Sequence, residues 1–209
     1  TSSAAACSRP AQDVPPAAAT PPPATQTAPA GPSGLFPGMG RHHHPMATTN
    51  ADAQRFFDQG VALVFGFNHE EAVRSFQRAA ELDPKAAMPQ WGIAWALGPN
   101  YNLDVDDPRA KQAFDAIQAA QTLSAAGPPI ERAYVGAMAS RYSSDMKADR
   151  AQLARRYANA ARDLMKAFPD DLDAATLYAE SLMNLRPWKL WDLEGTPAPD
   201  TLEPAAARL

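Results

Sequence analysis

The chain has 209 residues, a formal net charge of -4 and a pI of about 5.5. This weakly acidic balance lacks the basic face that releases counterions from a phosphate backbone, so we expect no nucleic-acid partner. The sequence also contains no apolar run of the roughly 18 residues that a membrane-spanning helix needs. We therefore expect membrane contact only through an attached lipid.

The first 46 residues differ in composition from the rest of the chain. They contain ten of the 21 prolines, with Ala, Thr and Gly between them. Such a segment has too few apolar side chains to offset the entropy of ordering, which favours a disordered or polyproline-like tail. The sequence thus predicts two parts, a Pro/Ala-rich stalk over 1–46 and a helical domain over 47–209.

The one cysteine, Cys7, lies in that tail within "TSSAAACSRP". Three small residues before a cysteine resemble the end of a bacterial lipoprotein signal, where the thiol is acylated after cleavage. This resemblance implies lipidation at Cys7 and a periplasmic or lipid-anchored outer-membrane location. The alternative is a chance cysteine in a disordered tail.

The first predicted helix covers 50–65, where apolar residues recur at helical spacing. Thr49 and Asp52 form a pattern typical of a capping box, with Asp in place of the usual Glu or Gln. Gly66 is the expected C-terminal stop.

A second helix follows at once. We expect Asn68 to cap it, with Glu71 bonding back to the cap backbone, and Pro84 to end it. Its predicted buried stripe consists of Ala72, Val73, Phe76, Ala79 and Ala80.

These two helices carry the pattern of the tetratricopeptide repeat, a helix–turn–helix unit of about 34 residues. The matching positions are Gly60, Leu63, Ala72, Phe76, Ala79 and Pro84. The segments "HHHPMATTNADAQRFFDQG", "FNHEEAVRSF", "WGIAWALGPNYN" and "DDLDAATLYAESLMNLRPW" resemble a bacterial cell-envelope group of tetratricopeptide proteins without an assigned reaction. The resemblance implies an all-α, right-handed α-solenoid of antiparallel helix pairs.

Later segments continue the repeat. A third pair is predicted over 129–142 and 147–168, followed by a seventh helix over 172–185. The closing "TLEPAAARL" reads as the start of another helix, so we expect the array to continue beyond the sequence. Antiparallel helices place "FGFNH", "GPNYNLDVDD", "RYSSD" and "RPWKLWDLEG" on one edge, and "FPDD" on the other edge with the histidine run.

By resemblance, the first helices of such pairs line a concave groove. The predicted groove residues are Gln54, Phe57, Gln59, Val61, Trp91 and Trp95. Trp91 and Trp95 lie one helical turn apart and share a face, which suits binding of an amphipathic helix or an extended peptide. This predicts a noncatalytic protein- or peptide-binding scaffold. The alternative is that further repeats or the Pro-rich tail cover the aromatic side chains.

The run His42, His43 and His44 provides imidazoles, which bind zinc, copper or nickel. A divalent metal site is thus an alternative function, whereas a native polar run on a loop is the interpretation that needs no cofactor. His69 at the first helix–helix turn joins that run only if the segment folds back along the array. Calcium at Asp104, Asp106 and Asp107 is a weaker alternative to helix capping by Asp107.

No catalytic motif is present in the sequence. We therefore expect a protein that is not an enzyme and has no cofactor. Solenoids can also stack end to end, which makes a self-assembling homo-oligomer a third possibility.

Overall fold

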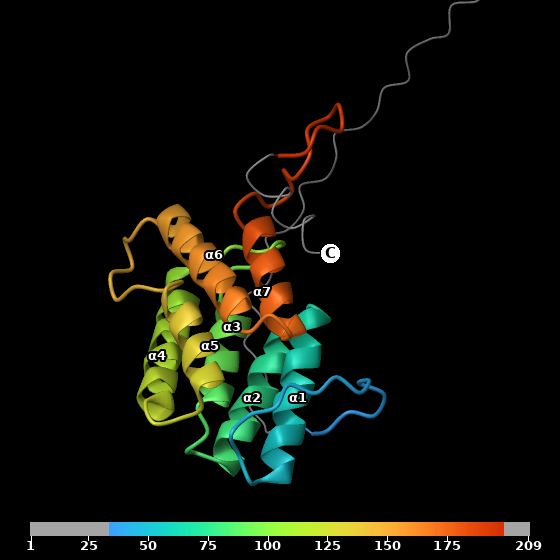
Figure 1. The fold of residues 1–209 in the computed structure, drawn as a ribbon, viewed down its shortest axis with the longest axis vertical. Helices are drawn as coiled ribbons and strands as arrows, with labels where there is room; N and C mark the ends of the chain where they lie inside the picture. The colour runs from blue at the N-terminus through green and yellow to red at the C-terminus, as the bar shows by residue number, and fades with distance from the viewer. Residues whose placement is uncertain (1–33, 199–209) are drawn as a thin grey trace, which may run out of the picture.

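The computed structural model describes residues 34–198, and its regular elements in that range are seven α-helices (Figure 1). They are α1 (Ala51–Phe65), α2 (His69–Leu82), α3 (Met88–Leu97), α4 (Asp107–Ser124), α5 (Pro129–Ala139), α6 (Arg150–Ala167) and α7 (Leu172–Met183). Extended backbone pairs in this range at an isolated bridge between Trp191 and Pro197. The all-α class is confirmed. The helix predicted in "TLEPAAARL" lies outside the described residues.

The ends of the first helix show how closely the sequence pattern locates a boundary. Gly66 is the C-cap residue that follows Phe65, the last residue of α1, as predicted. The N-terminal cap is Asn50 rather than Thr49, because the Asn50 side chain accepts the backbone N–H groups of Asp52 and Ala53 at 3.0 and 3.1 Å. The predicted capping box is therefore wrong in two respects. The cap lies one residue later than Thr49, and its side chain binds backbone N–H groups without a reciprocal bond from the Asp52 side chain being part of the cap.

Two further caps differ from their predictions. Asn68 occupies the cap position of α2, but its side chain makes no capping hydrogen bond. Glu71 accepts a hydrogen bond from Arg74 at 2.7 Å. At α4 the capping side chain is Asp106, which accepts the N–H of Arg109, so the assignment to the next residue was wrong.

Each helix packs against the next one along the chain, and α1 and α5 also both contact α3. The ring of Phe76, on α2, fills the space left by two glycines. A Cβ atom at Gly92 would lie 2.6 Å from this ring, and one at Gly60 would overlap it as well. The small and large positions of the repeat pattern thus correspond to a close approach of α1, α2 and α3.

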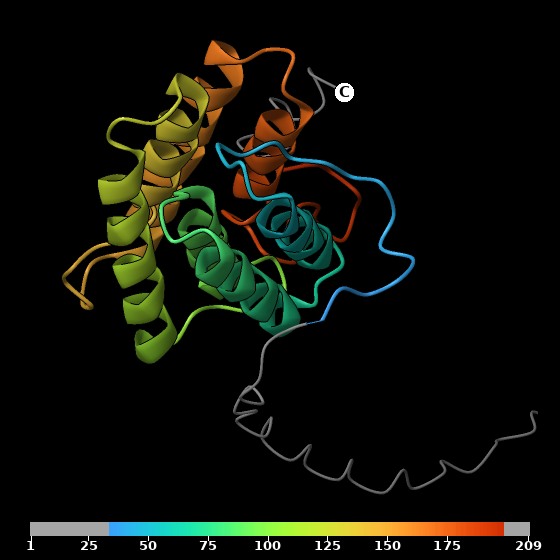
Figure 2. The same cartoon turned by 90° about the horizontal axis from the view of Figure 1, so that it is seen from below.

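The last helix turns back toward the middle of the array (Figures 1 and 2). Trp95 on α3 donates its indole N–H to Glu180 on α7 at 3.3 Å. Tyr134 on α5 donates its hydroxyl to Asp171, the N-cap of α7, at 2.8 Å. Side chains of α3, α5 and α7 therefore meet on one side of the molecule. Within residues 34–198, no helix has the length and apolar character required to cross a bilayer.

Candidate binding groove and pocket

Residues 34–48, here called the N-terminal strap, lie against α1. Composition assigns most of this segment to the tail, but His44 and Met46 are buried. Two side chains of α1 bind the strap backbone. Gln59 accepts the N–H of Phe36 at 2.7 Å and donates to the carbonyl of Gly34 at 2.9 Å.

Gln54, nearer the start of α1, repeats this pattern farther along the strap. It accepts the N–H of Met46 at 3.0 Å and donates to the carbonyl of His44 at 2.9 Å. Residue numbers rise along the strap while they fall along α1, so the strap runs antiparallel to the helix. Pairing of one side-chain amide with a backbone donor and a backbone acceptor is how an extended peptide is held.

The His44 ring is the main anchor of the strap. It lies between three aromatic rings, with centroids 5.8 Å from Phe57, 6.1 Å from Trp91 and 5.0 Å from Tyr134. These rings come from α1, α3 and α5. His44 therefore connects three helices through one buried imidazole.

Two aspartates hold the three histidines. His44 Nδ1 lies 2.6 Å from Asp173 Oδ2, and His42 Nε2 lies 3.2 Å from the same oxygen. His43 Nδ1 lies 2.8 Å from Asp58. Because an ionised carboxylate only accepts, each of these ring nitrogens is the donor.

Burial alone would raise the pKa of Asp173, but the hydrogen bond from His44 and the charges of His44 and His42 together lower it. Among residues 34–198, no three His, Cys, Asp or Glu side chains are grouped as a metal ion would require. The hydrogen bonds of the histidine run to Asp58 and Asp173 join the strap to α1 and α7.

The six predicted groove residues lie on α1 and α3 as the repeat pattern implies, but they face the chain itself. Phe57, Val61 and Trp91 are at most 2% exposed. The strap covers the region around Phe57 and Trp91, whereas Glu180 contacts Trp95. In the described structure, the strap therefore contacts Phe57 and Trp91 through His44, and Trp95 contacts other parts of the chain. Cys7 lies outside the described residues.

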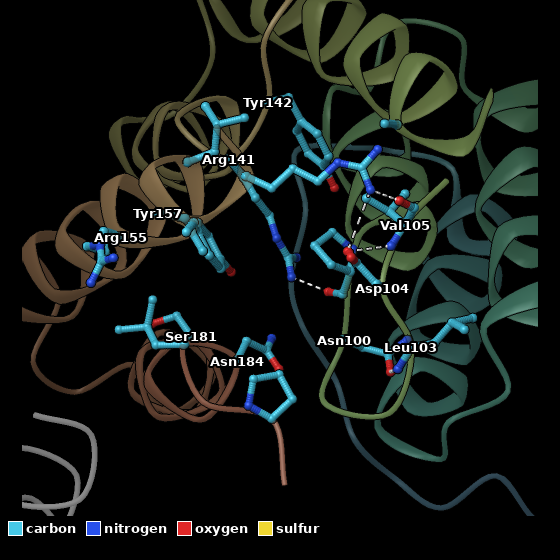
Figure 3. Close-up of a pocket in the computed structure, with 18 of the residues that line it drawn as sticks. Asn100, Leu103, Asp104, Val105, Arg141, Tyr142, Arg155, Tyr157, Ser181 and Asn184 are labelled. Carbon is cyan, nitrogen blue, oxygen red and sulfur yellow. Dashed lines mark hydrogen bonds and ion pairs between the residues drawn. The ribbon is translucent and has the colours of Figure 1, made fainter. Parts of the chain in front are cut away.

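A second, separate feature is a cavity of about 380 Å³ at the opposite edge (Figure 3). Its walls are the α3–α4 loop, the α5–α6 loop, α6 and the end of α7. Three turns that the repeat pattern places on one edge therefore do meet there. The loop wall is shaped by Asn100, whose side chain accepts the N–H groups of Asn102 and Leu103.

Arg141, in the α5–α6 loop, is a buried charged residue of the cavity lining. Its side chain is buried, its Nη2 donates to the carbonyl of Pro99, and its Cζ lies 4.7 Å from the centre of the Tyr157 ring. Within the described part of the chain it has no carboxylate at ion-pair distance, and its Nη1 has no hydrogen-bond partner.

Two polar atoms near Arg141 also lack a hydrogen-bond partner within the described residues. The hydroxyl of Tyr157 and Oδ1 of Asn184 are buried and have no hydrogen-bond partner among residues 34–198. Burial raises the pKa of Tyr157, so its hydroxyl keeps its proton at neutral pH. Figure 3 shows Arg141, Tyr157 and Asn184 on the side of the cavity that faces the Asn100 loop.

The acidic residues of the enlarged turn have structural roles. Arg150 donates to the carbonyl of Val105 and to the carboxylate of Asp107 at 2.5 Å, and it lies 3.8 Å from Asp104. A guanidinium therefore pairs with the carboxylate of Asp107 and lies near that of Asp104.

His69 also has no hydrogen-bond partner for either ring nitrogen within the described residues. Its pKa is lowered by burial and by the positive charges of Arg109 and Arg141. Two cationic neighbours disfavour a metal ion at this position.

The sequence did not single out the cavity residues Arg141, Tyr157 and Asn184. Each lies in or near a helix whose pattern explains it as a repeat position, and no spacing between them forms a motif. The one indication of the cavity in the sequence was that the repeat pattern places the turns of its wall on the same edge.

Comparison of the chain with protein-family models, with curated proteins and with solved structures finds no match in any of the three. The tetratricopeptide resemblance stays a prediction.

Proposed function

We propose that this protein is a noncatalytic, tetratricopeptide-like scaffold that binds an extended peptide or protein segment in the groove of α1 and α3. Successive helix packing, with α3 contacting both α1 and α5, supports an array of helix pairs, whose right-handed sense belongs to the proposal. The fit of Phe76 against Gly60 and Gly92 supports the same repeat. A cell-envelope location through Cys7 belongs to this proposal as well.

The observation that carries the proposal is the strap itself. An extended segment already occupies the groove, with its backbone bound by Gln54 and Gln59 and one ring inserted beside Trp91. The groove thus has the two components of peptide recognition, backbone pairing and a side-chain pocket. A partner segment of the same chemistry would place a ring with an N–H donor where His44 lies, within reach of Asp173.

Because the strap belongs to the same chain, it competes with any partner at an effective concentration of about millimolar. The test therefore loosens the strap without changing the groove. The variant is His44→Ala, and the probe is a fluorescein-labelled peptide with the sequence of residues 34–48, GLFPGMGRHHHPMAT. A matched peptide carries Ala in place of the third histidine.

We expect the labelled peptide to bind the His44→Ala chain at least about tenfold more tightly than it binds the unchanged chain, as measured by fluorescence anisotropy. The alanine peptide should bind the variant about tenfold more weakly than the intact peptide does. His43→Ala, which changes an exposed imidazole, is the matched protein control and should behave like the unchanged chain. Equal binding of the two peptides to the His44→Ala chain would show that the groove does not recognise the segment.

A further inference from the structure

We propose that the cavity beside Arg141 is a binding site for a small, singly charged amphipathic carboxylate, a ligand separate from any segment bound in the groove. The cavity lies at the turn edge, whereas the strap contacts α1 and the start of α7. The two sites therefore share no lining residue among those argued above.

Charge is the first reason for an anion. A buried guanidinium stays ionised, because its pKa is above 12 in proteins, and an unpaired buried charge is costly. Arg141 is 6% exposed and receives from the protein a carbonyl oxygen and an aromatic face. Tyr142 and Glu180 also act on it electrostatically, but within residues 34–198 no carboxylate lies at ion-pair distance from it. A ligand anion would supply the missing partner.

Hydrogen bonding specifies the head group further. Arg141 Nη1 and the Tyr157 hydroxyl are two donors without acceptors, and Asn184 Oδ1 is an acceptor without a donor. The complementary ligand has an anionic acceptor with a hydroxyl or N–H donor next to it. A 2-hydroxycarboxylate has this arrangement on adjacent atoms.

The walls specify the body of the ligand. The cavity is also lined by apolar side chains, namely Leu103, Val105, Met146, Leu153, Leu185 and Trp188. The Trp188 ring packs against Tyr101 at 5.2 Å and is 72% exposed, which places an aromatic surface at the edge of the cavity. A volume of about 380 Å³ is within the range of small-molecule sites and too small for a folded partner.

A phosphate is the less suitable anion. Glu180 already acts electrostatically on Arg141, and the cavity lining carries Asp104 and Asp145, which would repel a second negative charge. Arg150 and Arg155 in the same lining balance these two carboxylates, so Arg141 leaves one positive charge and a monoanion is favoured.

The test is calorimetric titration of the full chain with 3-phenyllactate, and with three matched probes. We expect phenyllactate to bind with a Kd on the order of 0.1–1 mM. Hydrocinnamate lacks the hydroxyl and should bind about tenfold more weakly, because Asn184 Oδ1 would stay unpaired. Phenyllactamide lacks the charge, and inorganic phosphate lacks the apolar body; neither should bind at 10 mM, which is about ten times the weakest expected Kd.

Tyr157→Phe is the decisive variant, because it removes only an unpaired hydroxyl and leaves the ring under Arg141. It should keep the thermal stability of the chain and weaken phenyllactate binding about tenfold. Tyr178→Phe, a buried tyrosine on α7 outside the cavity wall, is the matched control and should leave binding unchanged. Equal affinity for phenyllactate and its amide, unchanged affinity in Tyr157→Phe, or no binding of phenyllactate at 10 mM would each overturn the proposal.

Discussion

The imidazole of His44 lies parallel to the indole of Trp91, with ring planes 9° apart and centroids 6.1 Å apart. This pair joins a strap that precedes the first helix to the middle of the helical array. The same imidazole donates to Asp173, 129 residues farther along the chain. The histidine run is therefore part of the tertiary structure, and its contribution to stability can be measured residue by residue.

Replacing His44 with Ala should lower the free energy of unfolding by about 3 kcal/mol, because a buried ring and a hydrogen bond to a carboxylate are lost together. His43→Ala is the control, since the His43 side chain is 58% exposed and pairs with Asp58 at the surface. That change should cost at most about 1 kcal/mol. Urea unfolding of both variants measures the difference, and equal effects would contradict the anchoring role of His44.

Asp173 should make the stability of the chain depend on pH on the acid side. Its pKa lies below the ordinary value of 3.8, because the contributions of His44 and His42 outweigh the effect of burial. A lowered folded pKa gives stability that is present above the unfolded pKa and is lost as pH falls through the folded pKa.

Asp173→Asn should therefore reduce the free energy of unfolding most at neutral pH, and this deficit should shrink below pH 4, about the unfolded pKa. Denaturant unfolding at a series of pH values measures it. Asp163→Asn is the control for losing an exposed carboxylate. A deficit that stays constant from pH 7 to pH 2, a range spanning about five pH units around that pKa, would show that Asp173 acts through packing instead.

The helices and the residues on their inner faces could be predicted, because both follow from local spacing. Phe57 and Val61, like Trp91 and Trp95, are four residues apart, and helical geometry puts each pair on one face. The caps were less predictable, since Asn50 and Thr49 are both good capping residues and the choice depends on contacts outside the helix. Here Thr48 donates to Asp83, and Asn50 also donates to the carbonyl of Leu82.

The occupant of the groove could not be predicted from composition. A Pro- and Gly-rich segment lacks a periodic apolar face, and the order of the strap depends on one inserted ring and on hydrogen bonds to side chains of α1. The cavity could not be predicted from the sequence for a related reason. Arg141 follows α5, Tyr157 lies on α6 and Asn184 follows α7, and only the tertiary packing brings them together.

Gly92→Ala should destabilise the chain by about 1–3 kcal/mol, because a Cβ atom would overlap the Phe76 ring in a packed core. Gly136 on α5 is the matched control, since a Cβ atom there meets nothing within 4 Å. Gly136→Ala should stabilise the chain by up to about 1 kcal/mol through helix propensity. Thermal unfolding compares the two, and a neutral Gly92→Ala would show that the Phe76 ring can move aside.

Glu131 should show the opposite pH dependence to Asp173. Its side chain is buried on α5 and accepts the N–H of Ala47, the residue that follows Met46 in the strap. Burial raises its pKa, and this effect exceeds the lowering by the Ala47 hydrogen bond and the His44 charge. A raised folded pKa gives stability that is full below the unfolded pKa and is lost as pH rises through the folded pKa.

Glu131→Gln removes that ionisation while keeping a carbonyl oxygen for the Ala47 N–H. As pH rises from about 4 to 7, the variant should therefore gain stability relative to the unchanged chain. The lower value is about the unfolded pKa of a glutamate. Urea unfolding at both pH values measures the gain. Glu131→Ala is the control, because it removes the acceptor and should destabilise the chain at both values. If Glu131→Gln instead loses stability as pH rises, attraction between the Glu131 carboxylate and His44 outweighs the cost of burying the charge.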